Sequence, residues 1–235
     1  MKTAEQRIAE IRRPPSLANW VRLNDRRRDT TARRITRFVV GKPKHALAQV
    51  YRLVADYVTL NMPAENVGRG IARIINPLVR KLGFEIVSVL LPWLDKEEFK
   101  GIEVFHNFNV PYPIGRGIVI PVKPTFVCVY EGKLTPVFII GWSRIPFVDF
   151  HKKLFAAVVK RTILSMEGFE ASDALVLFVP RIKWAKTERY VHPMWINTLP
   201  EMSDEELREQ FDRFGNALDD AVPVILEELA KRGEQ

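Results

Sequence analysis

Two short apolar runs close together constrain the fold of this chain more than any other feature. They are Thr125-Phe126-Val127-Cys128-Val129-Tyr130 and Val137-Phe138-Ile139-Ile140. Both are rich in branched or aromatic residues and carry no charge, which is typical of strands buried on both faces of a sheet. Gly132-Lys133 between them predicts a two-residue hairpin turn. The sequence therefore predicts a buried hairpin in a central sheet that lies between helices.

A crossover follows the hairpin. We predict a helix from about Asp149 to Ser165 and another buried strand over Ala174-Leu175-Val176-Leu177-Phe178-Val179. A strand, a helix and a second buried strand form a crossover that should be right-handed, and this places the two strands parallel.

Short basic helices are predicted at the N-terminus. Thr3 to Arg13 forms a polar helix that Pro14-Pro15 ends, because neither proline can donate the next helical hydrogen bond. Ser16 caps a second segment, and Asp29 starts a third. Their thin apolar faces and many arginines indicate an arm that lies over something larger.

Apolar residues spaced three and four apart predict two amphipathic helices, Lys44 to Leu60 and Ala64 to Leu82. Pro77 predicts a kink in the second helix, and Gly83 stands where a C-terminal cap belongs. The period then becomes strand-like, so Phe84 to Leu91 predicts a strand.

Later segments complete the pattern. Gly101 to Phe108 is predicted as a further strand, and Val110 to Lys123 is a passage rich in proline and glycine. Ser203-Asp204-Glu205-Glu206 is a capping box, which opens a helix that reaches about Asp220 and restarts at Pro223.

These elements predict an α+β (mixed α/β) fold. Its central mixed β-sheet contains the buried hairpin and one βαβ crossover, and helices flank it at both termini. We expect a basic helical N-terminal arm over residues 1–43, an α/β core domain over residues 44–200, and an acidic C-terminal helical segment, residues 201–235, packed on the core.

Charge is polarised along the chain. Residues 1–45 contain 13 Lys or Arg against 4 Asp or Glu, a net charge of +9, whereas residues 201–235 contain 4 against 11, a net charge of −7. A basic segment of this strength is typical of proteins that bind a polyanion, nucleic acid above all. The acidic segment could fold back on the basic one or keep the protein in solution.

Other features exclude some classes of protein. The longest uncharged run, Val104 to Gly115, is too short and too polar to span a membrane. The polar N-terminus lacks the apolar stretch of a secretory signal, so we expect a cytoplasmic protein with no membrane partner. Cys128 is the one cysteine, and we expect it to be a small core residue.

The order of the elements resembles a known family. A helix, one or more strands, a hairpin of buried strands, a helix and a further buried strand, over roughly residues 65–182, are similar to the core of the PD-(D/E)XK nuclease, or restriction-endonuclease-like, superfamily. The resemblance implies that active members hold a divalent metal with an acidic residue on one strand and Glu-x-Lys on the next. That metal activates water against a phosphodiester.

Aligning the strand before the crossover helix with that pattern places Gly141 at the glutamate and Ser143 at the lysine. Glycine has no side chain to bind a metal, and a serine hydroxyl brings no charge to a metal or a phosphate. We therefore expect an endonuclease-like scaffold without catalytic residues, metal or cofactor, which holds nucleic acid without cutting it.

A literal Glu-x-Lys at Glu131-Gly132-Lys133 keeps a nuclease as the alternative. Such an enzyme would use Glu131 and Lys133 with Mg²⁺ or Mn²⁺, and Glu103 as the upstream acid. Against it, a turn glycine between polar residues is expected at a hairpin tip. Glu103 and His106 would also face opposite sides of a regular strand.

Two clusters are the candidate nucleic-acid contacts. Arginine can grip a phosphate with two hydrogen bonds, and cations beside aromatic rings suit phosphates and unstacked bases. The first cluster is Arg26, Arg27, Arg28, Arg33, Arg34 and Arg37. The second, after the last buried strand, is Arg181, Lys183, Trp184, Lys186 and Arg189. We expect the partner to be DNA, bound mainly through its phosphates.

A third hypothesis is an assembly or regulatory protein. The basic arm of one copy would meet the acidic tail of a second copy in a homodimer, because complementary charges speed encounter and fix register.

Overall fold

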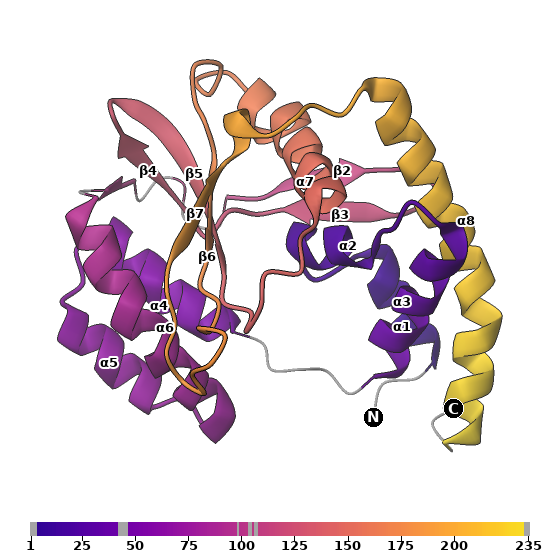
Figure 1. The fold of residues 1–235 in the computed structure, drawn as a ribbon, viewed down its shortest axis with the longest axis horizontal. Helices are drawn as coiled ribbons and strands as arrows, with labels where there is room; N and C mark the ends of the chain where they lie inside the picture. The colour runs from indigo at the N-terminus through magenta and orange to yellow at the C-terminus, as the bar shows by residue number, and fades with distance from the viewer. Residues whose placement is uncertain (1–3, 42–46, 98, 103–104, 106–107, 233–235) are drawn as a thin grey trace.

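A five-stranded mixed sheet forms the centre of the molecule. The computed structural model describes residues 4–41, 47–97, 99–102, 105 and 108–232. The order of the main sheet is β1-β4-β5-β6-β7, and β2 and β3 form a separate two-stranded sheet (Figure 1). The α+β fold class predicted from the sequence is therefore confirmed. The strands are β1 (Lys100–Gly101), β2 (Val110–Pro113), β3 (Val119–Val122), β4 (Phe126–Tyr130), β5 (Lys133–Ile140), β6 (Leu175–Phe178) and β7 (His192–Trp195).

The predicted hairpin and crossover are both present. Strands β4 and β5 pair antiparallel, and β5 pairs parallel with β6, with Val137 opposite Leu175. The two turn residues are Glu131 and Gly132, one position earlier than predicted, and their φ angles of 49° and 76° are those of a tight hairpin turn. Helix α7 (Asp149–Arg161) makes the crossover between the parallel strands.

Helices cover both faces of this sheet (Figure 1). One layer contains α4, α5 and α6, and the other contains α7 with the N- and C-terminal helices. Alternate residues of the central strands serve the two layers: Phe138 and Ile140 pack on the α7 side, and Val137 and Ile139 on the α6 side. The remaining helices are α1 (Ala4–Arg12), α2 (Leu17–Leu23), α3 (Arg28–Val40), α4 (Ala48–Thr59), α5 (Ala64–Ala72), α6 (Pro77–Lys96) and α8 (Asp204–Lys231), and the short 3-10 turns are Ile163–Ser165 and Ile196–Thr198.

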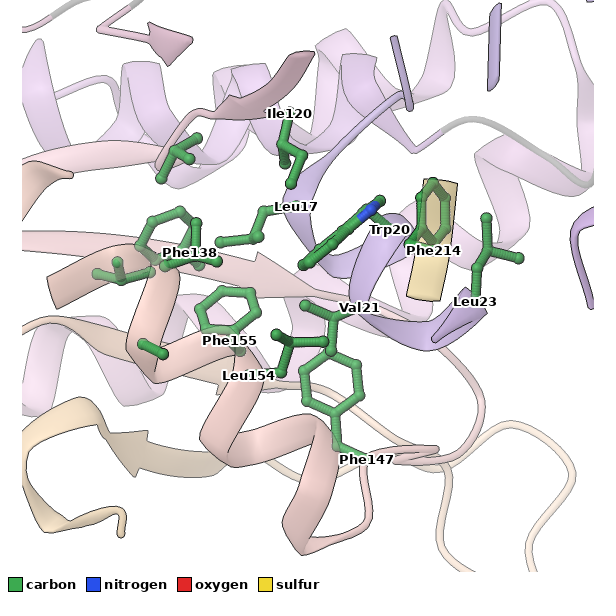
Figure 2. Packing of buried hydrophobic residues seen from close by; sticks show 14 of the residues in the cluster. Leu17, Trp20, Val21, Leu23, Ile120, Phe138, Phe147, Leu154, Phe155 and Phe214 are labelled. Atoms are coloured by element: carbon green, nitrogen blue, oxygen red, sulfur yellow. The ribbon is translucent and has the colours of Figure 1, made fainter. Parts of the chain in front are cut away.

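The N-terminal helices are part of the apolar interior. Ser16 caps α2, as predicted, by accepting a hydrogen bond from the Asn19 N–H. Figure 2 shows Leu17, Trp20 and Val21 of α2 among side chains of β5, α7 and α8. The ring of Trp20 is fully buried, and its centroid lies 5.6 Å from that of Phe214.

Helix α6 corrects the prediction of a strand over Phe84 to Leu91. Its residues are instead helical: the Asn76 side chain caps the first turn, Pro77 occupies the first helical position, and the helix continues to Lys96. Pro77 therefore begins α6, and the kink predicted at this proline is wrong. Gly83 lies inside α6, packed against α4 and α5 side chains, and is no C-terminal cap. The branched residues of this run misled the prediction, since the core overrides weak local propensity.

Three further segments differ from expectation. The passage from Val110 to Lys123 contains the β2–β3 hairpin, and β7 was not predicted at all. Helix α8 runs unbroken through Pro223, which is exposed, so water can satisfy the carbonyl that loses its donor. Of the segment predicted as a strand from Gly101 to Phe108, residues 103–104 and 106–107, with Glu103 and His106, lie outside the described residues, as do residues 42–46.

None of the described helices combines the length and apolar character needed to cross a membrane. Cys128 is buried in β4, as expected, and burial raises the pKa of its thiol to about 12. A thiol of this kind is chemically inert at neutral pH.

A buried histidine ties the N-terminal helices to the crossover helix. The imidazole of His151 accepts a hydrogen bond from the Val148 N–H at Nδ1, 3.3 Å away, and donates from Nε2 to the Asn24 carbonyl, 2.9 Å away. The Val148 N–H requires neutral imidazole, because a second proton on Nδ1 would face this donor, whereas the Asn24 carbonyl can accept from either form. Burial and the charge of Arg34 lower the pKa of His151.

This geometry predicts a loss of stability in mild acid. Because the pKa of His151 is lower in the folded chain than the unfolded value of 6.5, its contribution is complete above pH 6.5 and declines as the pH falls below it. The slope from one such group is at most about 1.4 kcal/mol per pH unit. Urea denaturation between pH 8 and pH 5 should give a flatter profile for His151→Gln than for the wild type, whereas the exposed control His192→Gln should follow the wild type. Parallel profiles for all three would contradict this role of His151.

Candidate functional site

The end of strand β5 is closed by side chains from the α6 layer. Gly141 follows the strand, and its N–H donates to the hydroxyl of Tyr51 at 2.7 Å. A Cβ atom at Gly141 would lie 2.5 Å from Cδ1 of Ile86 and 3.1 Å from the Tyr51 hydroxyl. At the position aligned with the glutamate of the nuclease pattern, even a methyl group would therefore force the end of the Ile86 side chain to move.

A buried arginine takes the place beside this glycine. Nη1 of Arg189 donates to the carbonyls of Gly141 at 3.2 Å and Val179 at 2.6 Å, the residues that follow β5 and β6. Its side chain has no solvent exposure. One guanidinium group thus donates hydrogen bonds at the carboxyl ends of both parallel strands. It satisfies two buried carbonyls that lie beyond the last paired residues of these strands.

Glu85 of α6 neutralises part of this charge. It accepts hydrogen bonds from Nε of Arg189 at 3.2 Å and from Nη2 of Arg181 at 2.8 Å, and its side chain is 7% exposed. Arg181 and Arg189 also pair through their backbones at the base of the loop between β6 and β7. One carboxylate therefore holds both ends of this loop against α6, and the three groups together carry a net charge of +1.

The environment of the cluster favours neutral Tyr51. Burial raises the pKa of Tyr51 to about 12, although the Gly141 hydrogen bond and the charge of Arg189 oppose the rise. Burial also lowers the pKa of Arg189, and Glu85 opposes that shift. Tyr51 is thus a neutral structural hydroxyl at physiological pH.

The loop tip exposes cations and an aromatic ring. The Nζ atom of Lys183 lies 4.8 Å from the ring centroid of Trp184, and Trp184 is 87% exposed. Within the part of the chain that the structure describes, neither Lys183 nor Lys186 has a carboxylate partner. Figure 1 shows the loop extending beside the α6 layer. A groove of about 450 Å³ separates them, lined by Phe84, Glu85, Ser88, Val89, Ile182, Thr187, Glu188 and Arg189.

The first predicted cluster lies elsewhere, on α3 and the link before it. Four of its six arginines form ion pairs, three with Asp25 and Asp29 of the arm itself and one with Asp220 of the acidic helix α8, which packs against α3. Arg26 lies over the Phe150 ring at 5.8 Å, and Arg37 is exposed without an ion pair among the described residues. The ion pairs are Arg27 with Asp29 at 2.8 Å, Arg28 with Asp220 at 2.5 Å, Arg33 with Asp29 at 3.7 Å and Arg34 with Asp25 at 2.8 Å.

The residues of the nuclease alternative are far from the strand end. Glu131 and Lys133 are exposed at the β4–β5 turn. Strand β5 has eight residues, so they lie roughly 26 Å from Gly141 at its other end. Glu103, their proposed partner, is outside the described residues. No group of three or more His, Cys, Asp or Glu that could hold a metal occurs among the residues described.

Sequence reasoning missed Glu85 and Tyr51. Both lie in segments whose apolar residues recur at regular spacing. Because residues 84–91 were interpreted as a strand, the layer that the Glu85 side chain faces could not be predicted. If the same residues are read with a helical period, Glu85 lies beside the buried stripe of the helix. An acidic residue within such an apolar run indicates a buried cation as its partner.

A search against family models found no match, and searches of curated proteins and of solved structures found no significant match.

The close packing at Gly141 predicts that any larger residue at this position lowers the stability of the fold. Gly141→Ala should lower the free energy of unfolding by about 1–3 kcal/mol, since the new methyl group must displace Ile86 and Tyr51. The matched control is Gly68→Ala in α5, where no atom lies within 4 Å of the new methyl group. That variant should gain about 0.5–1 kcal/mol. Equal effects in urea denaturation would show that the strand end is not closed.

Loss of the buried carboxylate should be more costly. Glu85→Gln leaves Arg189 without a compensating charge, so we expect the free energy of unfolding to fall by about 3 kcal/mol. The control Glu65→Gln breaks an exposed ion pair with Arg69 and should change it by less than about 1 kcal/mol. Similar losses in the two variants would contradict the buried cluster.

Proposed function

We propose that this protein binds nucleic acid, with DNA as the expected partner, through the loop between β6 and β7. The observation that carries the proposal is the loop tip, where Lys183, Trp184 and Lys186 are exposed and the two lysines have no acidic partner among the described residues. Unpaired cations beside an aromatic ring suit a phosphate backbone and its bases.

The charge balance favours this loop over the N-terminal arginines. Four of the six arginines in the first cluster pair with aspartates of the same chain, so a phosphate would have to displace those partners. Three of these pairs are exposed and therefore weak, whereas the pair of Arg34 with Asp25 is partly buried. The N-terminal arm can add to the contact with nucleic acid, but part of its positive charge is already neutralised by aspartates.

The strand end supports binding without cleavage. The helix α6, strand β1, hairpin β4–β5, helix α7 and strand β6 occur in the order on which the resemblance to the endonuclease-like core rests, although the β2–β3 hairpin lies between β1 and β4 and residues 84–91 are helical. At the positions aligned with that family's Glu-x-Lys, this chain has Gly141 and Ser143, and the guanidinium group of Arg189 lies beside Gly141. A guanidinium has no lone pair for a metal, and this one is buried and already engaged by Glu85 and two backbone carbonyls.

The self-association hypothesis has less support. Arg28 of the arm already pairs with Asp220 of α8 within one chain, at 2.6 Å between Nε and Oδ2. At least this arginine and this aspartate are thus paired within one chain.

Salt dependence tests the proposed surface. If Lys183 and Lys186 each neutralise one phosphate, the double variant Lys183→Ala/Lys186→Ala should reduce the slope of log affinity against log salt by about two units. The matched control Lys96→Ala/Arg208→Ala removes two exposed cations outside the loop and should leave the slope unchanged. Fluorescence anisotropy with labelled duplex and single-stranded DNA provides the measurement.

Two results would contradict the proposal. Binding that is equally strong in the loop variant and the control would remove the loop from the interface. Plasmid cleavage in magnesium or manganese that Glu131→Ala abolishes would establish the nuclease alternative instead.

A further inference from the structure

The exposed tryptophan at the loop tip indicates which form of nucleic acid the site takes. Resting on the proposed function, we infer that the loop binds a single-stranded segment, with an unpaired base stacked on the ring of Trp184.

Trp184 differs from the other tryptophans of the chain. Trp20 is fully buried, and Trp93, Trp142 and Trp195 pack against other aromatic rings. Trp184 has no aromatic neighbour within the described part of the chain and is 87% exposed. A tryptophan side chain can bury about 150–250 Å² of surface, so a partner that covers this ring gains a large contact.

One side of the ring already carries a cation. The Nζ atom of Lys183 lies 4.8 Å from the centroid, which is a favourable position over the aromatic face. A base on the opposite face would have its phosphate within the field of Lys183 and Lys186. The same three residues would thus bind a base and its backbone.

The groove beside the loop can receive an adjoining nucleotide. Its volume is about 450 Å³, and Phe84 and Ile182 on its walls are 43% and 40% exposed. Its polar groups include the hydroxyls of Ser88 and Thr187. The carboxylate of Glu188 can accept a hydrogen bond from an exocyclic amino group. These are the features of a site for a base, which has an apolar face and a polar edge.

A duplex cannot use this arrangement. Its bases are stacked on one another, so their faces are closed to a protein ring, whereas unpaired bases stack on aromatic side chains with little sequence preference. The loop should therefore bind single strands of DNA and RNA more tightly than duplex of the same length.

The test compares Trp184→Ala, Trp184→Phe and the wild type on labelled oligo(dT), oligo(U) and a duplex of equal length. We expect Trp184→Ala to weaken binding to the single strands by about 5- to 150-fold, the range for loss of one stacked base. Trp184→Phe should restore most of the affinity, and both variants should bind the duplex as the wild type does. Circular dichroism of each variant controls for folding.

Intrinsic fluorescence supplies a second readout. Oligo(dT) should quench the emission of the wild type, because a stacked base contacts the most exposed tryptophan. Trp184→Phe should show little quenching while it still binds.

The outcomes separate this inference from the function on which it rests. Less than a twofold loss for Trp184→Ala on single strands, with a clear loss for Lys183→Ala/Lys186→Ala, would overturn the stacking and leave phosphate binding intact. No binding of the wild type to any nucleic acid at low salt would overturn both. In sedimentation, the wild type could form a dimer that Trp184→Ala abolishes while nucleic-acid binding stays unchanged. That result would assign the ring to contact with a second copy of this chain and overturn the inference.

Discussion

Strands β5 and β6 are apolar on both faces, and the rest of the structure follows from the need to bury both. Phe138 and Ile140 require one helical layer, and Val137 and Ile139 require another. The chain meets this need with α4 to α6 on one face and with α7 and the terminal helices on the other. Burial of each such side chain contributes about 1.5–3 kcal/mol, so the two layers stabilise the sheet together.

The same burial leaves backbone carbonyls without hydrogen-bond partners where the parallel strands end. The carbonyls of Gly141 and Val179 lose strand partners in a region that water does not reach, and Arg189 supplies the missing donors. A buried cation is costly in turn, so Glu85 compensates it. The candidate site is thus a consequence of the fold: the groups that satisfy the strand ends also hold the loop that carries Lys183 and Trp184.

Charge polarity along the sequence becomes contact within the molecule. The acidic helix α8 packs on the basic helix α3, and Arg28 meets Asp220 across 192 positions of sequence. This contact reduces the positive field of the arm. Among the residues that the structure describes, Lys183 and Lys186 of the loop between β6 and β7 have no acidic partner, and for this reason the proposed contact with a polyanion is assigned to the loop rather than to the arm.

The hairpin, the Ser16 cap and the capping box at Ser203 could be read from the sequence, because each depends on residues a few positions apart. The crossover could be read from the order of its apolar and helical segments, although it pairs Val137 with Leu175. The sequence also indicated that Gly141 and Ser143 break the nuclease pattern. Only the tertiary structure decided that residues 84–91 are helical, and that Glu85 faces Arg181 and Arg189, which lie 96 and 104 positions away. Local periodicity reports which side of an element is apolar, whereas the packing of whole layers determines which distant charges meet.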